Sequence, residues 1–229
     1  MMEVILIVLA ILGVIGLGYL VRGLVIIYRA GKSFGKPRKF GTELHKLGVK
    51  AIWAEREGAS PIIEALLGSQ NRAAKLQKVQ MMGQSLAWLK NQGDQALKEL
   101  FNTGCRFEFL LLDPNSELMD MRCKQENPDL KNECLGFIKW IQEEFSMYES
   151  QLEVRVYRMT PTMGMTILNE KTLYVSHYAM TRRTHDMPML MMERGGMLFD
   201  RYSNEFKDVW SVAKKVFSIA EEKHVIGAS

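Results

Sequence analysis

A long uncharged segment near the amino terminus sets the strongest limit on the structure of this 229-residue chain. Residues Val4 to Val21 contain eighteen consecutive positions without a charged side chain. A helix of that length measures about 27 Å, close to the hydrocarbon thickness of a bilayer, roughly 30 Å. A cleaved signal peptide is the competing interpretation, but the preceding MME is acidic and no small-residue cleavage site follows. We therefore expect residues 1–29 to form a retained transmembrane helix.

Basic residues follow this segment with no acidic residue among them. The six are Arg22, Arg29, Lys32, Lys36, Arg38 and Lys39. Positive flanks stay on the cytoplasmic side, which predicts a single-pass protein with its N-terminus out and its C-terminal domain in the cytoplasm. Contact with nucleic acid is the alternative role for the same run. Three glycines in the apolar segment allow close helix approach, so we expect a homo-oligomer, a dimer or a tetramer.

The rest of the chain divides into a connector and a globular part. Residues 30–76 form a basic linker and a mostly helical connector, and residues 77–229 form the domain. Strands are expected at 79–82, 105–112, 152–159, 163–168, 172–178 and 189–192, and helices at 85–100, 129–150 and 199–222. Residues 169–171 are expected to close a hairpin. The order predicts an α/β fold in which one mixed sheet is flanked by helices.

Four segments, in this order, resemble one half of the phospholipase D-like fold. They are MMGQSLAWL, LFNTGCRFEFLLLDPNSELM, LEVRVYRMTPTMGMTILNEKTLYVSHY and PMLMMERGGMLFDRYSNEFKDVW. In that family a hairpin carries the motif H-x-K-x4-D, and a Gly-Ser step follows on the next strand. The resemblance places Thr162 at the histidine, Gly164 at the lysine and Asn169 at the aspartate. Val175 and Ser176 then stand at the Gly-Ser step.

The departures from the family motif determine the chemistry that the resemblance implies. Phosphodiester exchange in this family uses the histidine as nucleophile and the lysine to neutralise the phosphate. Thr162 and Gly164 supply neither group, and none of the four histidines has a lysine two positions later. The three cysteines have no metal-ligand spacing and agree with a reducing compartment. We therefore predict no catalytic residue, no metal, no cofactor and no enzymatic activity.

Basic and aromatic side chains around the hairpin form the candidate ligand site. Cations for phosphates, together with rings for base stacking, are typical of proteins that bind single-stranded nucleic acid. Solvated strand faces or core positions are the alternative interpretation of the same side chains. The candidate ligand-binding residues are Arg155, Arg158, Thr162, Asn169, Lys171, Ser176, His177, Arg182, Arg183 and His185.

The whole arrangement is similar to membrane effectors of bacterial anti-phage defence, including the DNA-gated Hailong type. The resemblance implies an oligomeric single-span effector of the bacterial inner membrane, an ion channel gated by a nucleotide or single-stranded DNA oligomer. The ligand would bind the pseudo-phospholipase D domain, and a nucleotidyltransferase encoded nearby is the expected further partner. Two alternatives stay open. One is a membrane-anchored phosphodiesterase, a phospholipase or nuclease with an atypical active site, and the other is a non-catalytic membrane scaffold.

Overall fold

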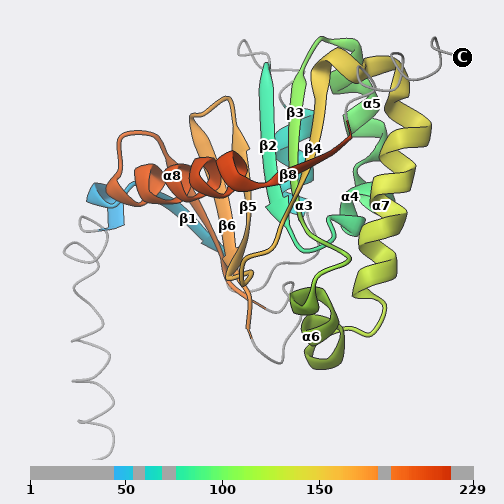
Figure 1. Cartoon of the computed structure of the whole chain (residues 1–229). Coiled ribbons are helices and arrows are strands. Elements are labelled where there is room, and N and C mark those ends of the chain that lie inside the picture. Colours follow the sequence, from blue (N-terminus) through green and yellow to red (C-terminus); the bar gives the residue numbers. More distant parts are fainter. Residues whose placement is uncertain (1–43, 54–59, 69–75, 180–186, 218–229) are drawn as a thin grey trace, which may run out of the picture. The chain divides into compact units, whose positions relative to one another are not determined.

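The centre of the protein is one mixed sheet. The computed structural model describes residues 44–53, 60–68, 76–179 and 187–217 (Figure 1). The chain divides into two compact units, Met1–Leu44 and His45–Ser229, and the elements named below belong to the second. Eight strands form the sheet in the order β1-β7-β6-β5-β2-β3-β4-β8. The predicted α/β class, with a mixed sheet flanked by helices, is confirmed.

Parallel and antiparallel pairs occur in the same sheet. The strands are β1 (Val49–Trp53), β2 (Lys78–Gly83), β3 (Arg106–Leu112), β4 (Leu152–Tyr157), β5 (Met163–Leu168), β6 (Thr172–His177), β7 (Met189–Glu193) and β8 (Lys214–Phe217). The helices are α3 (Ser60–Gly68), α4 (Ala87–Gln92), α5 (Asp94–Asn102), α6 (Glu117–Gln125), α7 (Leu130–Phe145), the 3-10 helix η1 (Ser146–Gln151) and α8 (Met197–Val212). β2, β3 and β4 are mutually parallel, and the remaining pairs are antiparallel.

Helices cover both faces of the sheet. α8 packs on one face, against β4, β6 and β7, while α5 and α7 pack on the other (Figure 1). Phe107 and Phe109 are two residues apart on β3, so both side chains point to the same face, toward α5 and α7. The ring centroids of Phe107 and Phe101 lie 4.5 Å apart, and those of Phe109 and Phe137 lie 5.4 Å apart. All four rings are buried, and burying each contributes roughly 1.5–3 kcal/mol to folding. This aromatic layer anchors α5 and α7.

The hairpin between β5 and β6 has the turn that its sequence predicts. Asn169 and Glu170 both have positive φ, 51° and 54°, as the mirror-image turn of a two-residue hairpin requires. The Asn169 side-chain oxygen accepts hydrogen bonds from the backbone nitrogens of Gln77 and Lys78, at 2.7 and 3.1 Å. Asn169 therefore ties the hairpin to the beginning of β2.

Four segments differ from their predicted structure. The connector was expected to be mostly helical, but Val49–Trp53 forms β1, whose backbone pairs with β7 at the edge of the sheet. β1 lies in the compact unit His45–Ser229. The predicted helix 85–100 is divided into α4 and α5 at Gly93, where a Cβ would lie only 2.5 Å from a methyl carbon of Leu89.

The carboxyl end of the domain also differs. The predicted helix 199–222 ends at Val212, and β8 follows and pairs with β4, which satisfies the backbone of an otherwise unpaired edge. Residues 218–222 lie outside the described residues. The helix predicted over 129–150 ends at Phe145 and continues as η1.

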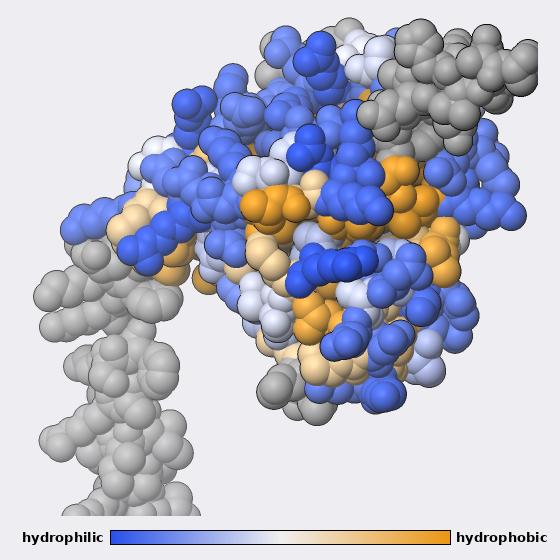
Figure 2. All heavy atoms as spheres, viewed as in Figure 1, coloured by the Kyte–Doolittle hydropathy of each residue, from blue (hydrophilic) through white to orange (hydrophobic). Residues whose placement is uncertain are grey.

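In the described ranges, no helix combines the length and the apolar character needed to cross a membrane. The predicted single-pass localisation in the bacterial inner membrane is corrected on this finding and is not carried further. The predicted transmembrane segment, residues 1–29, and the basic linker that follows it lie outside the described residues. On the α8 side the described surface is mainly hydrophilic with scattered hydrophobic patches (Figure 2).

Candidate ligand-binding cavity

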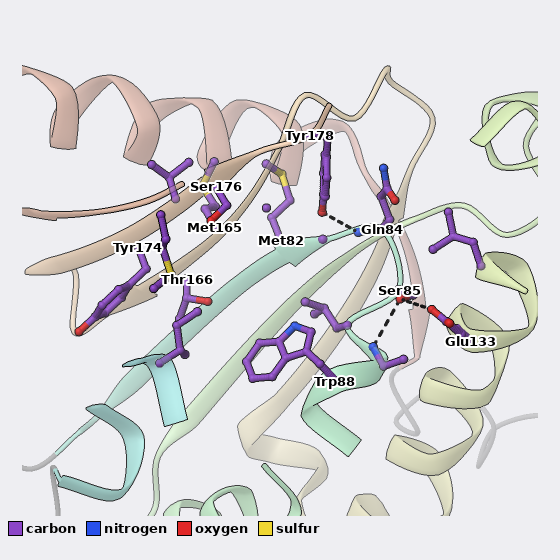
Figure 3. A pocket seen from close by; sticks show the side chains of 18 of the residues that line it. Met82, Gln84, Ser85, Trp88, Glu133, Met165, Thr166, Tyr174, Ser176 and Tyr178 are labelled. Carbon is purple, nitrogen blue, oxygen red and sulfur yellow. Dashed lines mark hydrogen bonds between the residues drawn. The ribbon is translucent and has the colours of Figure 1, made fainter. Parts of the chain in front are cut away.

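A cavity of about 600 Å³ opens at one edge of the sheet (Figure 3). Because β5 runs opposite to both β2 and β6, the carboxyl ends of β2 and β6 meet the amino end of β5 at this edge. Gly83, Gly164 and Ser176 line the cavity from these three strand ends, and Ile62 of α3 and Trp88 of α4 line it from the helical side. Carboxyl ends of strands are the usual place for ligands in α/β sheets, and the volume suits a small molecule.

Polar side chains of the strands line this cavity on the face away from α8. Thr166 and Tyr174 are paired across β5 and β6, and Ser176 is paired with Gly164 in the same register. Ser176 is 2% exposed, and its Oγ has no hydrogen-bond partner within the part of the chain that the structure describes. Leaving a buried hydroxyl unsatisfied costs about 1–3 kcal/mol. Ser176 therefore offers the cavity an unused hydrogen-bonding group.

Tyr178 occupies the space beside the position of the family lysine. A Cβ added to Gly164 would lie 3.0 Å from the Tyr178 hydroxyl oxygen, tighter than ordinary contacts. The same hydroxyl accepts a hydrogen bond from the backbone nitrogen of Gln84, at 3.1 Å. A side chain at position 164 would therefore require the Tyr178 phenol to shift by a few tenths of an ångström.

A buried ion pair, formed by Arg122 and Glu126, lies beside Tyr178. Arg122 donates a hydrogen bond to Glu126 one turn later on α6, and their side chains are 6% and 7% exposed. Arg122 also donates to the carbonyl of Ala179, at 3.3 Å, and lies 5.9 Å from the ring centroid of Tyr178. In the amide orientation that satisfies both of its ends, Gln84 donates to Glu126 and accepts from Arg122. Glu126 thus neutralises the cation nearest to this part of the cavity.

A second carboxylate, Glu133 of α7, lines the cavity directly. Its two oxygens accept hydrogen bonds from different side chains, the Asn127 amide at 2.8 Å and the Ser85 hydroxyl at 3.3 Å, the latter drawn in Figure 3. A carboxylate can accept about four hydrogen bonds, so each oxygen keeps capacity for a ligand. The two bonds hold the carboxylate in a fixed orientation at the cavity wall.

The predicted ligand-binding residues are distributed over several places, and among those described only Ser176 lines the cavity. Arg155 lies on the α8 face, where it donates to the carbonyl of Trp210 at 2.8 Å and lies 4.5 Å from the centroid of that ring. Arg158 pairs with Asp113 at 2.7 Å. His177 also faces α8, and its Nε2 lies 3.2 Å from the Tyr202 hydroxyl oxygen. These three side chains are therefore engaged outside the cavity.

The remaining predicted residues lie still further apart in the fold. Asn169 and Lys171 belong to the β5–β6 turn, at the sheet edge opposite to the cavity. Thr162 precedes β5 as an exposed residue, and its carbonyl accepts a hydrogen bond from the Tyr178 backbone nitrogen at 2.9 Å. Ligand contact by these side chains stays a prediction, as it does for three residues outside the described ranges, Arg182, Arg183 and His185.

Three buried titratable groups have shifted pKa values. Burial alone would raise the pKa of the Asp113 carboxyl, but hydrogen bonds from Arg158 and from the Asn115 backbone outweigh it and lower the pKa. Burial raises the pKa of the Cys134 thiol to about 12 and that of the Tyr157 phenol well above its usual range. Asp113 is therefore charged at neutral pH and the other two are neutral. In the described ranges no group of three or more His, Cys, Asp or Glu residues could hold a metal ion.

Most of the residues that build this cavity were not among the predicted site residues. One available signal was the polar pair that directly follows the buried strand β2, at the end where ligands bind. Another was the oppositely charged pair four residues apart on α6. The missed residues are Gln84, Ser85, Trp88, Arg122, Glu126 and Glu133.

No family model matches the chain, and no curated protein matches it. Solved structures with a similar fold include TrmBL2, an archaeal chromatin protein described as showing a novel mode of DNA binding, at 16% identity and a TM-score of 0.45. The match covers 82% of this chain and 66% of TrmBL2. A phospholipase D family member, Nuc from Salmonella typhimurium, matches at 12% identity and a TM-score of 0.46, over 73% of this chain and 97% of Nuc.

A third similar structure is phosphatidylserine synthase from Haemophilus influenzae Rd KW20. It matches at 12% identity and a TM-score of 0.49, over 72% of this chain but only 38% of the synthase. At these identities and scores the likeness carries no conclusion on substrate or reaction. The prediction that this chain is not an enzyme is nevertheless corrected and withdrawn, because a phospholipase D family member and a phosphatidylserine synthase are among the similar structures.

Proposed function

We propose that this chain binds a nucleotide or single-stranded DNA through the cavity between β2, β5, β6 and α4. The observation that carries the proposal is the buried Ser176 hydroxyl, which lines the cavity and has no partner among the described residues. Trp88 and Tyr174 line the same cavity and supply aromatic surface, which typically contributes about 1–3 kcal/mol for each stacked base. A hydrogen-bonding group beside aromatic rings suits a nucleobase.

The remaining parts of the sequence-based expectation are separable from this proposal. A nucleotidyltransferase encoded nearby and a role in anti-phage defence rest on the family resemblance alone, whereas self-association into a dimer or tetramer rests also on the three glycines of the apolar segment. The ion channel rests on the resemblance as well. Binding in the cavity requires none of them, and it can be measured on the purified full chain.

The test is a titration of the full chain with 5′-labelled single-stranded DNA, followed by fluorescence anisotropy. Trp88→Phe removes part of the aromatic wall and keeps its apolar character, so we expect binding to weaken by about tenfold at most. Trp210→Phe is the matched control, because Trp210 lies on α8 beside Arg155 and does not line the cavity. Equal effects of the two substitutions, or no binding by the unaltered chain, would contradict the proposal.

A second candidate function is phosphodiester cleavage. It is favoured by the convergence of Gly164 and Ser176 at the cavity, because these positions correspond to the lysine and the serine of the family motif. The cleaving group would have to be something other than the family's histidine nucleophile.

Incubation with end-labelled single-stranded DNA tests this candidate. Product release that disappears in Ser176→Ala and persists in His177→Ala would place the reaction in the cavity, since His177 lies on the α8 face. Product release that disappears in Thr162→Ala would place it at the position of the family nucleophile. Intact DNA after long incubation with saturating protein would exclude cleavage of this substrate and leave the binding proposal unaffected.

A further inference from the structure

The cavity is lined by acidic side chains, which are unfavourable for the phosphate groups of a nucleotide. Glu126 and Glu133 line it, whereas no lysine, arginine or histidine of the described residues does. The cation next to Glu126 is Arg122, and it is already neutralised within the buried pair. A phosphate placed here would meet an uncompensated carboxylate, Glu133, in a partly buried site where charges are weakly screened.

The same lining is complementary to a nucleobase. Trp88, Tyr174 and Tyr178 provide aromatic surface, and the side-chain amides of Asn91 and Asn127 can donate and accept hydrogen bonds. Ser176 adds a buried hydroxyl without a partner in the described part of the chain, an observation independent of the carboxylates. Aromatic surface with a few polar groups is what a site needs to hold a flat heterocycle by stacking and to read its edge.

Glu133 determines which edge can be read. Asn127 and Ser85 fix the carboxylate, and its remaining lone pairs can only accept hydrogen bonds. Guanine presents two adjacent N–H donors, its ring nitrogen and its amino group, which match the two oxygens of a carboxylate. Thymine presents one N–H between two carbonyl oxygens, and both oxygens would be repelled. Adenine and cytosine present an amino group beside a ring acceptor, so we expect their affinities to lie between those of guanine and thymine.

We propose that this cavity is a nucleobase pocket that excludes phosphate and in which Glu133 selects bases with N–H donors, guanine above all. The inference rests on the proposed function and specifies which part of the ligand enters the cavity. The phosphates of a bound nucleotide then lie outside it.

The experiment measures direct binding of deoxyguanosine, thymidine, deoxyguanosine monophosphate and inorganic phosphate to the full chain, by tryptophan fluorescence and thermal unfolding. We expect deoxyguanosine to bind within about threefold of its monophosphate, and thymidine to bind at least about tenfold more weakly. Inorganic phosphate at the same concentrations is expected to have no effect. Binding of phosphate alone, or loss of binding when the phosphate is removed from the nucleotide, would overturn the proposal.

Two variants on one helix test the selecting residue. Glu133→Gln keeps the size of the side chain but replaces one acceptor by a donor, so deoxyguanosine binding should fall at least about tenfold. Glu143→Gln removes an exposed carboxylate of α7 that does not line the cavity, and no change is expected. Equal affinities in the two variants would refute the role of Glu133.

The outcomes also separate this inference from the proposed function. If labelled single-stranded DNA binds and no nucleoside binds or competes, the base pocket is wrong and the proposed function stands. If neither nucleosides nor DNA bind, both are wrong. If nucleosides bind and DNA does not, the pocket is correct and the proposed ligand is restricted to nucleotides.

Discussion

Replacing Ser176 by alanine should stabilise the folded protein and weaken ligand binding. The Ser176 hydroxyl is buried to 98% on β6, given its 2% exposure, and has no hydrogen-bond partner among the described residues. Removing such a group recovers its desolvation cost, about 1–3 kcal/mol. For a domain of this size, each kcal/mol raises Tm by about 2–4 °C. The ligand complex loses a hydrogen bond, so binding should weaken by about three- to tenfold.

The assay is thermal unfolding followed by circular dichroism, with Ser116→Ala as the matched control. Ser116 is also buried, but its hydroxyl donates to the Asp113 carbonyl and accepts from the Met119 nitrogen as the N-cap of α6. Its removal should lower the free energy of unfolding by about 0.5–2 kcal/mol. A fall in Tm for Ser176→Ala would show that the hydroxyl is already satisfied in the protein without ligand, and the reasoning would be refuted.

Three further predictions concern other parts of the fold. Because the pKa of Asp113 is lowered in the folded protein, its charged carboxylate stabilises the fold at any pH above the ordinary carboxyl pKa. This stabilisation is lost as the pH falls through the pKa of folded Asp113. Arg158→Gln should therefore move acid unfolding to higher pH. With its pKa at about 12, on the order of one Cys134 in ten thousand is a thiolate at pH 8, so iodoacetamide should label Cys123, the partly exposed cysteine, first. Asn169→Ala removes two hydrogen bonds and places alanine at a positive φ, which should cost about 1–3 kcal/mol in chemical denaturation.

Each of these has a control within the chain. Acid unfolding at the same pH in Arg158→Gln and the unaltered protein would show that the pair does not lower the Asp113 pKa. Mass spectrometry of the folded protein locates the alkylated cysteine, and equal labelling of Cys123 and Cys134 would mean that burial does not protect the latter. Asn169→Gly tolerates the positive φ and loses only the hydrogen bonds, so its stability should lie between those of Asn169→Ala and the unaltered protein.

Local sequence patterns determined much of the sheet. Alternating and continuous apolar runs predicted β2 to β7, and the turn at 169–171 followed from its place between two of these runs. β1 was missed because its pattern V-K-A-I-W is short and its pairing partner β7 lies about 140 residues later in the chain. β8 was missed because the amphipathic pattern of α8 continues into it, while the unpaired edge of β4 makes the strand more favourable.

The cavity could be predicted only in part. Among the positions that the family resemblance aligned with its motif, Gly164 and Ser176 line the cavity, whereas Thr162 and Asn169 do not. The resemblance could not show that the Tyr178 hydroxyl lies close to Gly164, because that requires the distance between the two residues. The basic and aromatic pattern around the hairpin gave Arg155 a ligand role, whereas its side chain contacts the carbonyl and the ring of Trp210 on α8. The charge of the cavity depends on α6 and α7, which are remote from the motif.

Photo-crosslinking tests the central claim, that a nucleobase enters the cavity, most directly. Short single-stranded DNA that carries a photoreactive guanine analogue at one position is irradiated with the full chain, and crosslinked peptides are identified by mass spectrometry. The account predicts crosslinks at Trp88 of α4 and at Tyr174 or Tyr178, all of which line the cavity. Crosslinks confined to the α8 face, around Trp210 and His177, would contradict it.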